Sequence, residues 1–252
     1  MTTAILSALP EEQAGLHAQL RPATLVRHAG REFHAGQWHA RPVVLALSRI
    51  GKVAAATTAT LLIERFGVRR IIFTGVAGGL GPGVRVGDTV VARETLQHDM
   101  DASPIFARHE IPLYGRSRFD TDAALSGLLL DTAREVATRA WQRMSPALRV
   151  QFGLHEPPGV HHGLLLSGDR FISSASEARA LQQELPDALA VDMEAAAVAQ
   201  VCNDYDVAFA AVRNVSDRAD DQAHVDFPAY LSQVAGVQAE ALIGALLERL
   251  RD

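Results

Sequence analysis

The amino-acid sequence predicts an α/β fold, a single domain in which helices flank a mixed, mainly parallel central β-sheet. Short apolar runs of strand length alternate along the chain with longer segments of helical pattern. The runs are apolar throughout, which is typical of strands buried on both faces of a parallel sheet. The 252 residues are 48% hydrophobic, which is enough for one large core, and they contain no repeat or linker. We therefore predict one domain over residues 1–252.

The N-terminal half is predicted to hold five strands and two helices. Pro10 ends the first apolar run and suits the first turn of a helix that continues to about residue 20. Small residues on one face of residues 51–66 predict a long helix that packs closely against the sheet. The predicted strands are residues 3–9, 31–38, 42–47, 69–73 and 86–92.

A glycine-rich segment, residues 74–81, follows one of these strands. Glycines after a buried strand predict a turn whose backbone N–H groups can approach a ligand closely. The spacing matches neither the dinucleotide fingerprint nor the Walker phosphate loop. A plain wide turn is the alternative.

The C-terminal half is predicted to alternate in the same way. Residues 189–203 combine a short buried strand, two acids (Asp192 and Glu194) and a tightly packed helix. Acids in this position either cap the helix or face a ligand. The other predicted helices are residues 122–144, 176–185 and 230–250, and the other strands are residues 163–169 and 207–212. Loops are predicted at residues 103–119, at 224–227 and at 145–159, the last a long loop or lid rich in proline and glycine.

Composition excludes several classes of protein. The net charge is −5 with no basic stripe, which argues against a nucleic-acid partner. No apolar run approaches the roughly 20 residues of a membrane helix, and the N-terminus lacks the pattern of a signal peptide. The only cysteine, Cys202, lies in an apolar helical pattern and is expected to be a small buried hydrophobe. We expect a cytoplasmic protein that binds no membrane.

Residues 97–101 include His98, Asp99 and Asp101, a grouping that can suggest a metal site. The chain has no second cluster of this kind. We therefore expect a polar loop with internal hydrogen bonds, and no metal.

Polar and aromatic residues follow several predicted strands, and ligands of open α/β sheets bind outside the carboxyl ends of the strands. Three acids, an arginine, an aromatic ring and the glycine-rich segment are therefore expected to line one crevice. A pair of carboxylates can cleave a glycosidic bond, with one protonating the leaving group and the other activating water. The candidate residues are Glu12, Val76, Ala77, Gly78, Phe171, Ile172, Glu194, Arg213, Ser216 and Asp217.

Four motifs in this order resemble the nucleoside phosphorylase-I superfamily. They are Thr74-Gly75-Val76-Ala77-Gly78-Gly79-Leu80, Ser167-Gly168-Asp169-Arg170-Phe171-Ile172, Val191-Asp192-Met193-Glu194-Ala195 and Val212-Arg213-Asn214-Val215-Ser216-Asp217. Within the superfamily the chain is most similar to 5′-methylthioadenosine/S-adenosylhomocysteine nucleosidases. The segments Ala8-Leu9-Pro10-Glu11-Glu12 and Ile50-Gly51-Lys52-Val53-Ala54-Ala55-Ala56 fit that branch as well.

The resemblance implies a nucleoside substrate, hydrolysis of its N-glycosidic bond and no cofactor. Glu12 would activate the water, and Asp217 would protonate purine N7. Glu194 would bind the ribose hydroxyls, with Met193 packed on the sugar. Arg213 and Ser216 would support the water and Asp217.

The resemblance also implies the contacts of the base. Phe171 would stack on the purine, and the backbone of Ile172 would read its edge. Asp192, turned away from the sugar by strand alternation, is expected to be structural. Val76, Ala77 and Gly78 would complete the binding surface.

A phosphorylase is the nearest alternative, because a phosphorolytic enzyme must hold an anion at the sugar. Glu11 and Glu12 stand where phosphorylases of the superfamily usually place an arginine, which favours hydrolysis. Arg49 could contact an anion, although a surface arginine is the expected reading. A futalosine-like nucleoside and a non-catalytic nucleoside-binding protein are further alternatives.

Three further expectations concern departures from the family and the loop at residues 101–115. Val76 replaces a serine that is usual in the branch, and residues 139–159 look longer than in that branch. In the family, the loop matching residues 101–115 crosses a dimer interface to cover the neighbour's site. Pro104, Ile105, Phe106 and Pro112 are apolar enough for that role. We therefore expect a homodimer.

Overall fold

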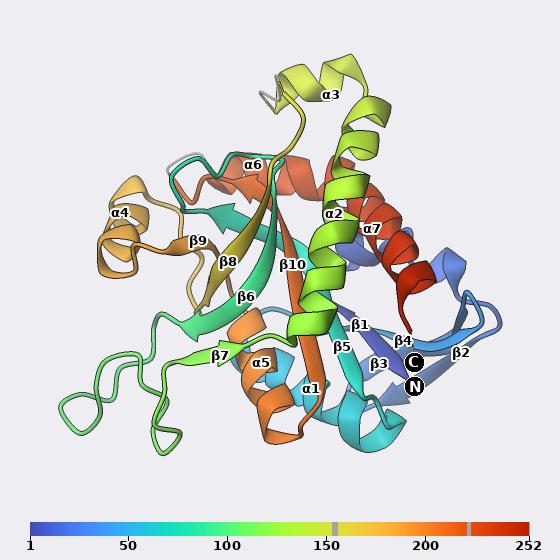
Figure 1. Cartoon of the computed structure of the whole chain (residues 1–252), viewed down its shortest axis with the longest axis horizontal. Helices are drawn as coiled ribbons and strands as arrows, with labels where there is room; N and C mark the ends of the chain where they lie inside the picture. The colour runs from blue at the N-terminus through green and yellow to red at the C-terminus, as the bar shows by residue number, and fades with distance from the viewer. Residues whose placement is uncertain (153–155, 221–222, 252) are drawn as a thin grey trace.

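The computed structural model describes residues 1–152, 156–220 and 223–251, and one large β-sheet runs through them (Figure 1). The ten strands are β1 (Thr3–Ser7), β2 (Ala23–His28), β3 (Arg31–Trp38), β4 (Arg41–Leu47), β5 (Arg70–Gly79), β6 (Thr89–Gln97), β7 (Arg118–Asp120), β8 (Val160–Ser167), β9 (Ala188–Asp192) and β10 (Ala208–Asp217). The predicted α/β class with a mixed central sheet is confirmed.

The sheet is open at one side and curls on itself at the other. Strands β5, β1 and β4 are parallel neighbours, and β3 and β2 extend that side in antiparallel pairs. Strand β5 also pairs with both β10 and β9, and the path β10-β6-β8-β9 joins these two partners. Five strands therefore close a ring, which brings the carboxyl ends of β5, β8, β9 and β10 together.

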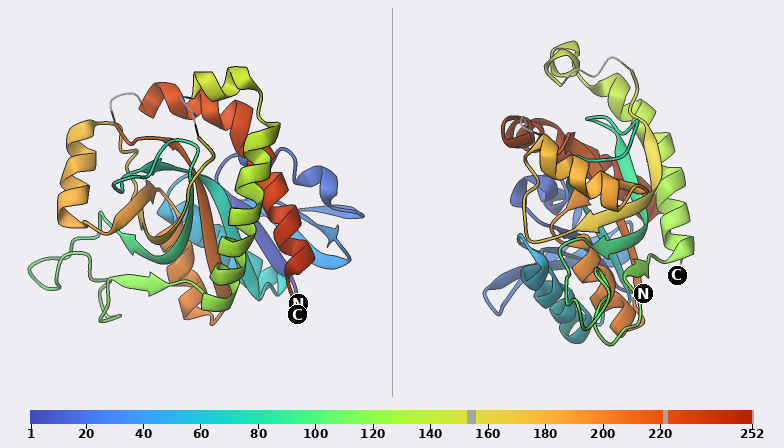
Figure 2. Two further views of the ribbon diagram at one scale, coloured as in Figure 1. Left: turned by 45° about the horizontal axis from the view of Figure 1, so that its top comes forward. Right: turned by 90° about the vertical axis from the view of Figure 1, so that its left-hand side faces the viewer.

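Helices cover both faces of the sheet because its central strands are apolar on both sides (Figures 1 and 2). On β5, Ile71 and Phe73 point to the face covered by α1 and α5, whereas Ile72 points to the face covered by α2 and α7. The helices are α1 (Lys52–Phe66), α2 (Ala123–Arg143), α3 (Pro146–Gln151), α4 (Ala175–Glu184), α5 (Ala195–Asp204), α6 (Ala223–Tyr230) and α7 (Gly236–Arg249), together with the short turns η1 (Pro10–Gln13), η2 (His17–Gln19) and η3 (Leu231–Ala235).

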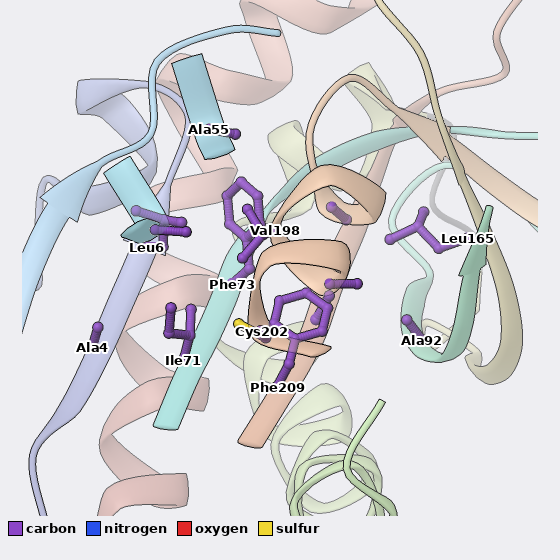
Figure 3. Packing of buried hydrophobic residues seen from close by; sticks show 14 of the residues in the cluster. Ala4, Leu6, Ala55, Ile71, Phe73, Ala92, Leu165, Val198, Cys202 and Phe209 are labelled. Carbon is purple, nitrogen blue, oxygen red and sulfur yellow. The ribbon is translucent and has the colours of Figure 1, made fainter. Parts of the chain in front are cut away.

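The larger core cluster lies under α1 and α5 (Figure 3). Phe73 and Phe209 reach it from neighbouring strands, and Val198 and Cys202 reach it from α5. Cys202 is 1% exposed, and burial raises the pKa of its thiol. The cysteine is therefore the inert core residue that the sequence predicted.

The structure corrects the predicted turn at residues 74–81. Strand β5 continues through this segment to Gly79, and Val76 and Ala77 pair with β10. A Cβ built on Gly75 would lie 2.5 Å from Glu12 Oε1, and one on Gly78 would lie 3.1 Å from Asp217 Oδ1. These glycines make room for carboxylates beside a strand, and they do not form a turn.

Other boundaries also differ from the prediction. The helix predicted up to residue 20 is replaced by η1 and η2, with Gly15 packed so closely on Glu240 that a Cβ would collide. Strand β2, whose residues are mostly exposed, was not predicted because it carries no buried apolar run. The last strand continues beyond residue 212 to Asp217, and residues 224–227 belong to helix α6.

Part of the predicted lid at residues 145–159 forms helix α3. Ser145 caps the helix by accepting a hydrogen bond from the backbone of Leu148, and Pro146 occupies its first turn. The guanidinium of Arg149 lies 4.1 Å from the centre of the Trp141 ring. Residues 153–155 of the predicted loop lie outside the described residues.

One helical stretch, residues 227–249, meets the length and composition of a membrane span, although polar residues interrupt it and it is not one apolar run. A window of 18 residues within this stretch has a mean hydropathy of 1.2. Half of the window is buried inside the fold, where Leu242, Ile243 and Leu246 pack against the sheet. The apolar residues of this stretch are therefore those of a core helix.

Candidate active site

A cavity of about 350 Å³ lies at the carboxyl ends of β5, β8, β9 and β10. This volume is in the range of small-molecule sites. All eleven candidates from the sequence line the cavity. Its wall also includes residues that sequence reasoning did not select, namely Ala8, Leu9, Ile50, Arg170, Val191, Asp192 and Phe227.

Glu12 is a buried carboxylate held by three backbone N–H groups. Its Oε2 accepts hydrogen bonds from Ala8 N at 2.8 Å and Leu9 N at 2.9 Å, and its Oε1 accepts one from Val76 N at 2.9 Å. Burial raises the pKa of Glu12, against the lowering effects of the Arg213 charge and of these hydrogen bonds. A raised pKa brings a carboxylate closer to the proton affinity that a general base needs at neutral pH.

Asp217 is a second buried carboxylate at the end of β10. The Ser216 hydroxyl donates to Asp217 Oδ2 at 2.8 Å, and Ala219 N donates to Asp217 Oδ1 at 2.8 Å. Glu12 contacts β5 at Val76, and Asp217 approaches it at Gly78. The two contact points are about 7 Å apart along the strand.

Asp192, in the cavity wall, links the end of β8, the start of α5 and β10 through hydrogen bonds. Its Oδ1 accepts hydrogen bonds from Ser167 Oγ and from the backbone N–H groups of Glu194 and Ala195, and its Oδ2 accepts one from Arg213 Nε at 2.8 Å. The carboxylate thus makes four hydrogen bonds within the protein, which supports the structural role predicted for it, but Asp192 lines the cavity and is not turned away from it as expected. It fixes both the turn that carries Glu194 and the position of Arg213.

Arg213 lies between these acids with 1% of its surface exposed. Its guanidinium carbon stacks 4.0 Å from the centre of the Phe73 ring, and its charge lowers the pKa of both Glu12 and Glu194 against the effect of burial. Its Nη2 is buried and donates no hydrogen bond within the part of the chain that the structure describes. A ligand oxygen in the adjoining cavity can accept that bond.

Glu194 is 4% exposed at the start of α5, and its Oε1 accepts a hydrogen bond from Gly51 N at 2.9 Å. Burial, followed by the nearby charge of Asp192, raises its pKa to about 8, while Arg213 and the Gly51 N–H oppose the rise. A carboxyl group here can hydrogen-bond the two hydroxyls of a diol in either protonation state, because each hydroxyl can donate as well as accept.

The opposite part of the wall is aromatic. Phe171 is 44% exposed, and its ring meets the edge of the Phe227 ring at a centroid distance of 5.7 Å. Ile172 is buried beside it. An exposed ring beside acids and backbone groups suits a planar polar ligand.

Arg49 and the polar segment 97–101 were further candidates for ligand contacts. Arg49 does not line the cavity; it is exposed and donates to the carbonyl of Gly30. Asp99 bonds Lys52 and the backbone of Asp169, so the predicted internal hydrogen bonding of residues 97–101 is wrong for this residue. The described residues hold no cluster of three or more His, Cys, Asp or Glu side chains that could bind a metal.

The residues that the sequence missed left only weak signals. Leu9 and Ile50 stand inside the motifs quoted for the family resemblance, directly beside the predicted site. Phe227 lies in a segment predicted as loop, and only the packing of α6 places its ring at the cavity.

The raised pKa of Glu194 predicts a pH dependence of stability. The folded protein holds the Glu194 proton up to about pH 8, whereas the unfolded chain releases it near 4.5. The contribution of this group is therefore fully present below pH 4.5 and is lost as the pH rises to about 8, at up to about 1.4 kcal/mol per pH unit. We expect a Glu194→Gln variant to melt at increasingly higher temperature than the wild type between pH 5 and pH 9. A difference that stays constant over this range would contradict the assignment, and Glu32→Gln on the exposed surface is the control.

Comparison with known proteins gives a consistent result. The family model described as phosphorylase superfamily matches residues 2–248. A 5′-methylthioadenosine/S-adenosylhomocysteine nucleosidase of Mycobacterium bovis is 34% identical over 98% of this chain and 97% of its own length. The nucleosidase of the same name from Neisseria meningitidis, solved with methylthio-immucillin-A, superposes with a TM-score of 0.87 at 32% identity over 99% of both chains. A futalosine hydrolase mutant of Helicobacter pylori superposes with a TM-score of 0.84 at 29% identity, over 99% of this chain and 100% of its own.

Proposed function

The chain belongs to the phosphorylase superfamily, and we propose that it is an N-glycosyl hydrolase that releases the base from a purine nucleoside. The proposed substrates are 5′-methylthioadenosine and S-adenosylhomocysteine, and the products are adenine and the 5-substituted ribose. The nucleosidase names of relatives that match nearly the whole chain support this substrate class. Salvage of the methylthioribose unit toward methionine is the role that such a reaction serves.

The observation that carries the proposal is the buried carboxylate of Glu12 at the cavity. A carboxylate held by Ala8 N, Leu9 N and Val76 N repels a phosphate ion but can accept a proton from water. Val76 has no hydroxyl that could help, so the water would depend on Glu12 itself and on Arg213. This arrangement favours hydrolysis over phosphorolysis.

The remaining roles follow from the geometry of the cavity. Asp217 would protonate N7 of the leaving purine, with Ser216 holding its second oxygen. Glu194 would bind the ribose hydroxyls and so hold the sugar in place. Phe171 would stack on the base, with the Ile172 backbone at its edge.

A futalosine-like nucleoside is the second candidate substrate, because the futalosine hydrolase superposes almost as well as the nucleosidases. The two substrate classes differ at the 5′ position of the sugar. The apolar wall of Leu9, Ile50 and Phe227 suits the methylthio group. This wall supports the methylthioadenosine assignment.

One assay tests the proposed function. The purified protein is incubated with methylthioadenosine, adenosine, inosine and futalosine, with and without phosphate, and the free base is measured. We expect release of adenine from methylthioadenosine at the same rate in both buffers. Strict dependence on phosphate would contradict the hydrolase proposal. A preference for futalosine would make futalosine, and not methylthioadenosine, the assigned substrate.

We further propose a cytoplasmic homodimer in which residues 101–115 complete the neighbour's site, each protomer being one domain. The segment projects from the body of the molecule between β6 and β7 (Figure 1). Ile105 and Leu113 are 83% and 92% exposed on it and offer apolar surface that a partner could cover. Size-exclusion chromatography should give the mass of a dimer, and a monomer at all concentrations would contradict the proposal.

A further inference from the structure

Outside the cavity, three polar residues close a ring of hydrogen bonds. The backbone N–H of Lys52 donates to Asp169 Oδ1 at 2.7 Å, and the backbone N–H of Asp169 donates to Asp99 Oδ2 at 2.8 Å. The Lys52 ammonium completes the ring by donating to Asp99 Oδ1 at 2.6 Å. None of the three residues lines the cavity. We refer to Lys52, Asp99 and Asp169 as the polar ring.

The polar ring joins the segment that contacts the proposed ribose-binding residue to the segment that carries the proposed base-stacking residue. Gly51, which precedes Lys52, donates its N–H to Glu194 Oε1 at the proposed ribose position. Phe171, two residues after Asp169, is the proposed stacking ring for the base. A change in the ring would therefore move the ribose contact and the base contact relative to each other.

The backbone at Gly51 shows how tightly these segments meet. Gly51 has φ +95° and ψ 157°, a conformation that essentially only glycine adopts. A Cβ at this position would lie 3.1 Å from Asp169 Oδ1. The chain thus passes between the two carboxyl groups. The N–H of Gly51 donates to Glu194, and the N–H of the next residue, Lys52, donates to Asp169.

Lys52 is the only lysine in the chain, among 24 basic residues of which all others are arginine. Its ammonium also donates to Gln97 Oε1 at 3.1 Å, and Gln97 Nε2 donates to Gln200 Oε1 of α5 at 2.8 Å. The Lys52 side chain is 15% exposed and that of Asp99 is 23% exposed. A compact ammonium suits two acceptors on one strand end better than the planar fork of an arginine.

The negative charge of Asp99 is stabilised by its hydrogen-bond partners in the polar ring. Burial raises the pKa of Asp99, but the hydrogen bond from Lys52 and the backbone N–H of Asp169 outweigh it and lower the pKa overall. Asp99 therefore remains an acceptor for both partners throughout the neutral range.

We propose that Lys52, Asp99 and Asp169 are positioning residues that fix the Gly51 contact to Glu194 relative to the segment that carries Phe171. This inference rests on the proposed function of the cavity. The ring does not touch the substrate; it acts through Gly51 and through the segment that carries Phe171. Its loss should weaken nucleoside binding and misalign the ribose without unfolding the protein.

Steady-state kinetics of Lys52→Met and Asp99→Asn, singly and combined, test the proposal with methylthioadenosine as substrate. We expect each single variant to raise KM about tenfold and to lower kcat about threefold, because small misplacements of reacting groups are costly. The double variant should be no worse than either single variant, since each change opens the same ring. Each single variant should also melt at a lower temperature than the wild type, because it leaves the other partner of a mostly buried ion pair without its counter-charge, so the kinetics are measured at a temperature where the variants remain folded.

The controls separate this inference from the proposed function. Glu32→Gln breaks the exposed Arg27–Glu32 ion pair on β2 and β3 and should leave KM and kcat unchanged. Wild-type kinetics in both single variants, or additive losses in the double variant, would overturn the positioning role while the function stands. Failure of the wild type to release any base would overturn both.

Lys52→Arg provides a second measure if the methionine variant folds poorly. It keeps the positive charge but replaces the compact donor by a larger planar one. A raised KM at the wild-type melting temperature supports the ring. An unchanged KM contradicts the need for a compact ammonium at this position.

Discussion

Replacement of Glu12 by glutamine should lower kcat by about 10²–10⁴-fold, the usual contribution of a general base. Glutamine nearly preserves the size of the side chain but has no basic oxygen to take a proton from water. Its amide must also place an NH₂ group beside one of the backbone donors that now bind the carboxylate, at Val76 or at Ala8 and Leu9. Single-turnover release of adenine from methylthioadenosine measures the loss directly.

The matched control is Glu11→Gln, because Glu11 is exposed one residue before Glu12. It changes the same functional group in the same turn and should retain wild-type kcat. Binding of adenine, measured by calorimetry, should be preserved in Glu12→Gln, since Glu12 is not assigned to the base. Turnover within threefold of the wild type would remove Glu12 from its proposed role.

Replacement of Asp217 by asparagine should cause a loss of the same order, about 10²–10⁴-fold in kcat, for a different reason. Asparagine can keep both contacts, with Oδ1 accepting from Ala219 N and Nδ2 donating to Ser216 Oγ. It cannot transfer a proton to purine N7, so the base must leave as an anion. The loss should therefore depend on the leaving group.

A substrate with a better leaving group separates this role from a structural one. A 5-methylthioribose derivative carrying 4-nitrophenolate at C1 needs no protonation to depart, and Asp217→Asn should cleave it at close to the wild-type rate. Asp206→Asn, on the exposed turn just before β10, is the control that should change neither rate. An equal loss for both substrates in Asp217→Asn would contradict the role of proton donor.

The alternation of apolar and helical segments was sufficient to predict the α/β class and most elements. Residues 51–66 and 122–144 form α1 and α2 almost as predicted, and the paired strands at 31–38 and 42–47 are β3 and β4. The errors occur where tertiary contacts override local pattern. Gly75, Gly78 and Gly79 stay in a strand because β10 and β9 pair with them, although glycine alone favours a turn.

The sequence by itself identified eleven of the residues that line the cavity, from strand ends and from the motifs of the family, but it did not identify the rest of the wall, such as Phe227. It did not determine which carboxylates are engaged by the protein. Asp192 and Glu194 are two residues apart and chemically similar, yet Asp192 is fully hydrogen-bonded by Ser167 and Arg213, whereas Glu194 bonds only Gly51 among the described residues.

Only the tertiary structure decided this difference, because Ser167, Arg213 and Gly51 all lie far from residues 192–194 in the sequence. The same holds for Glu12, whose Oε1 accepts a hydrogen bond from Val76 of β5, and for the polar ring, which joins the start of α1 to the segments after β6 and β8. Burial and partner atoms set the pKa and the hydrogen bonding of a carboxylate, and long-range packing supplies both.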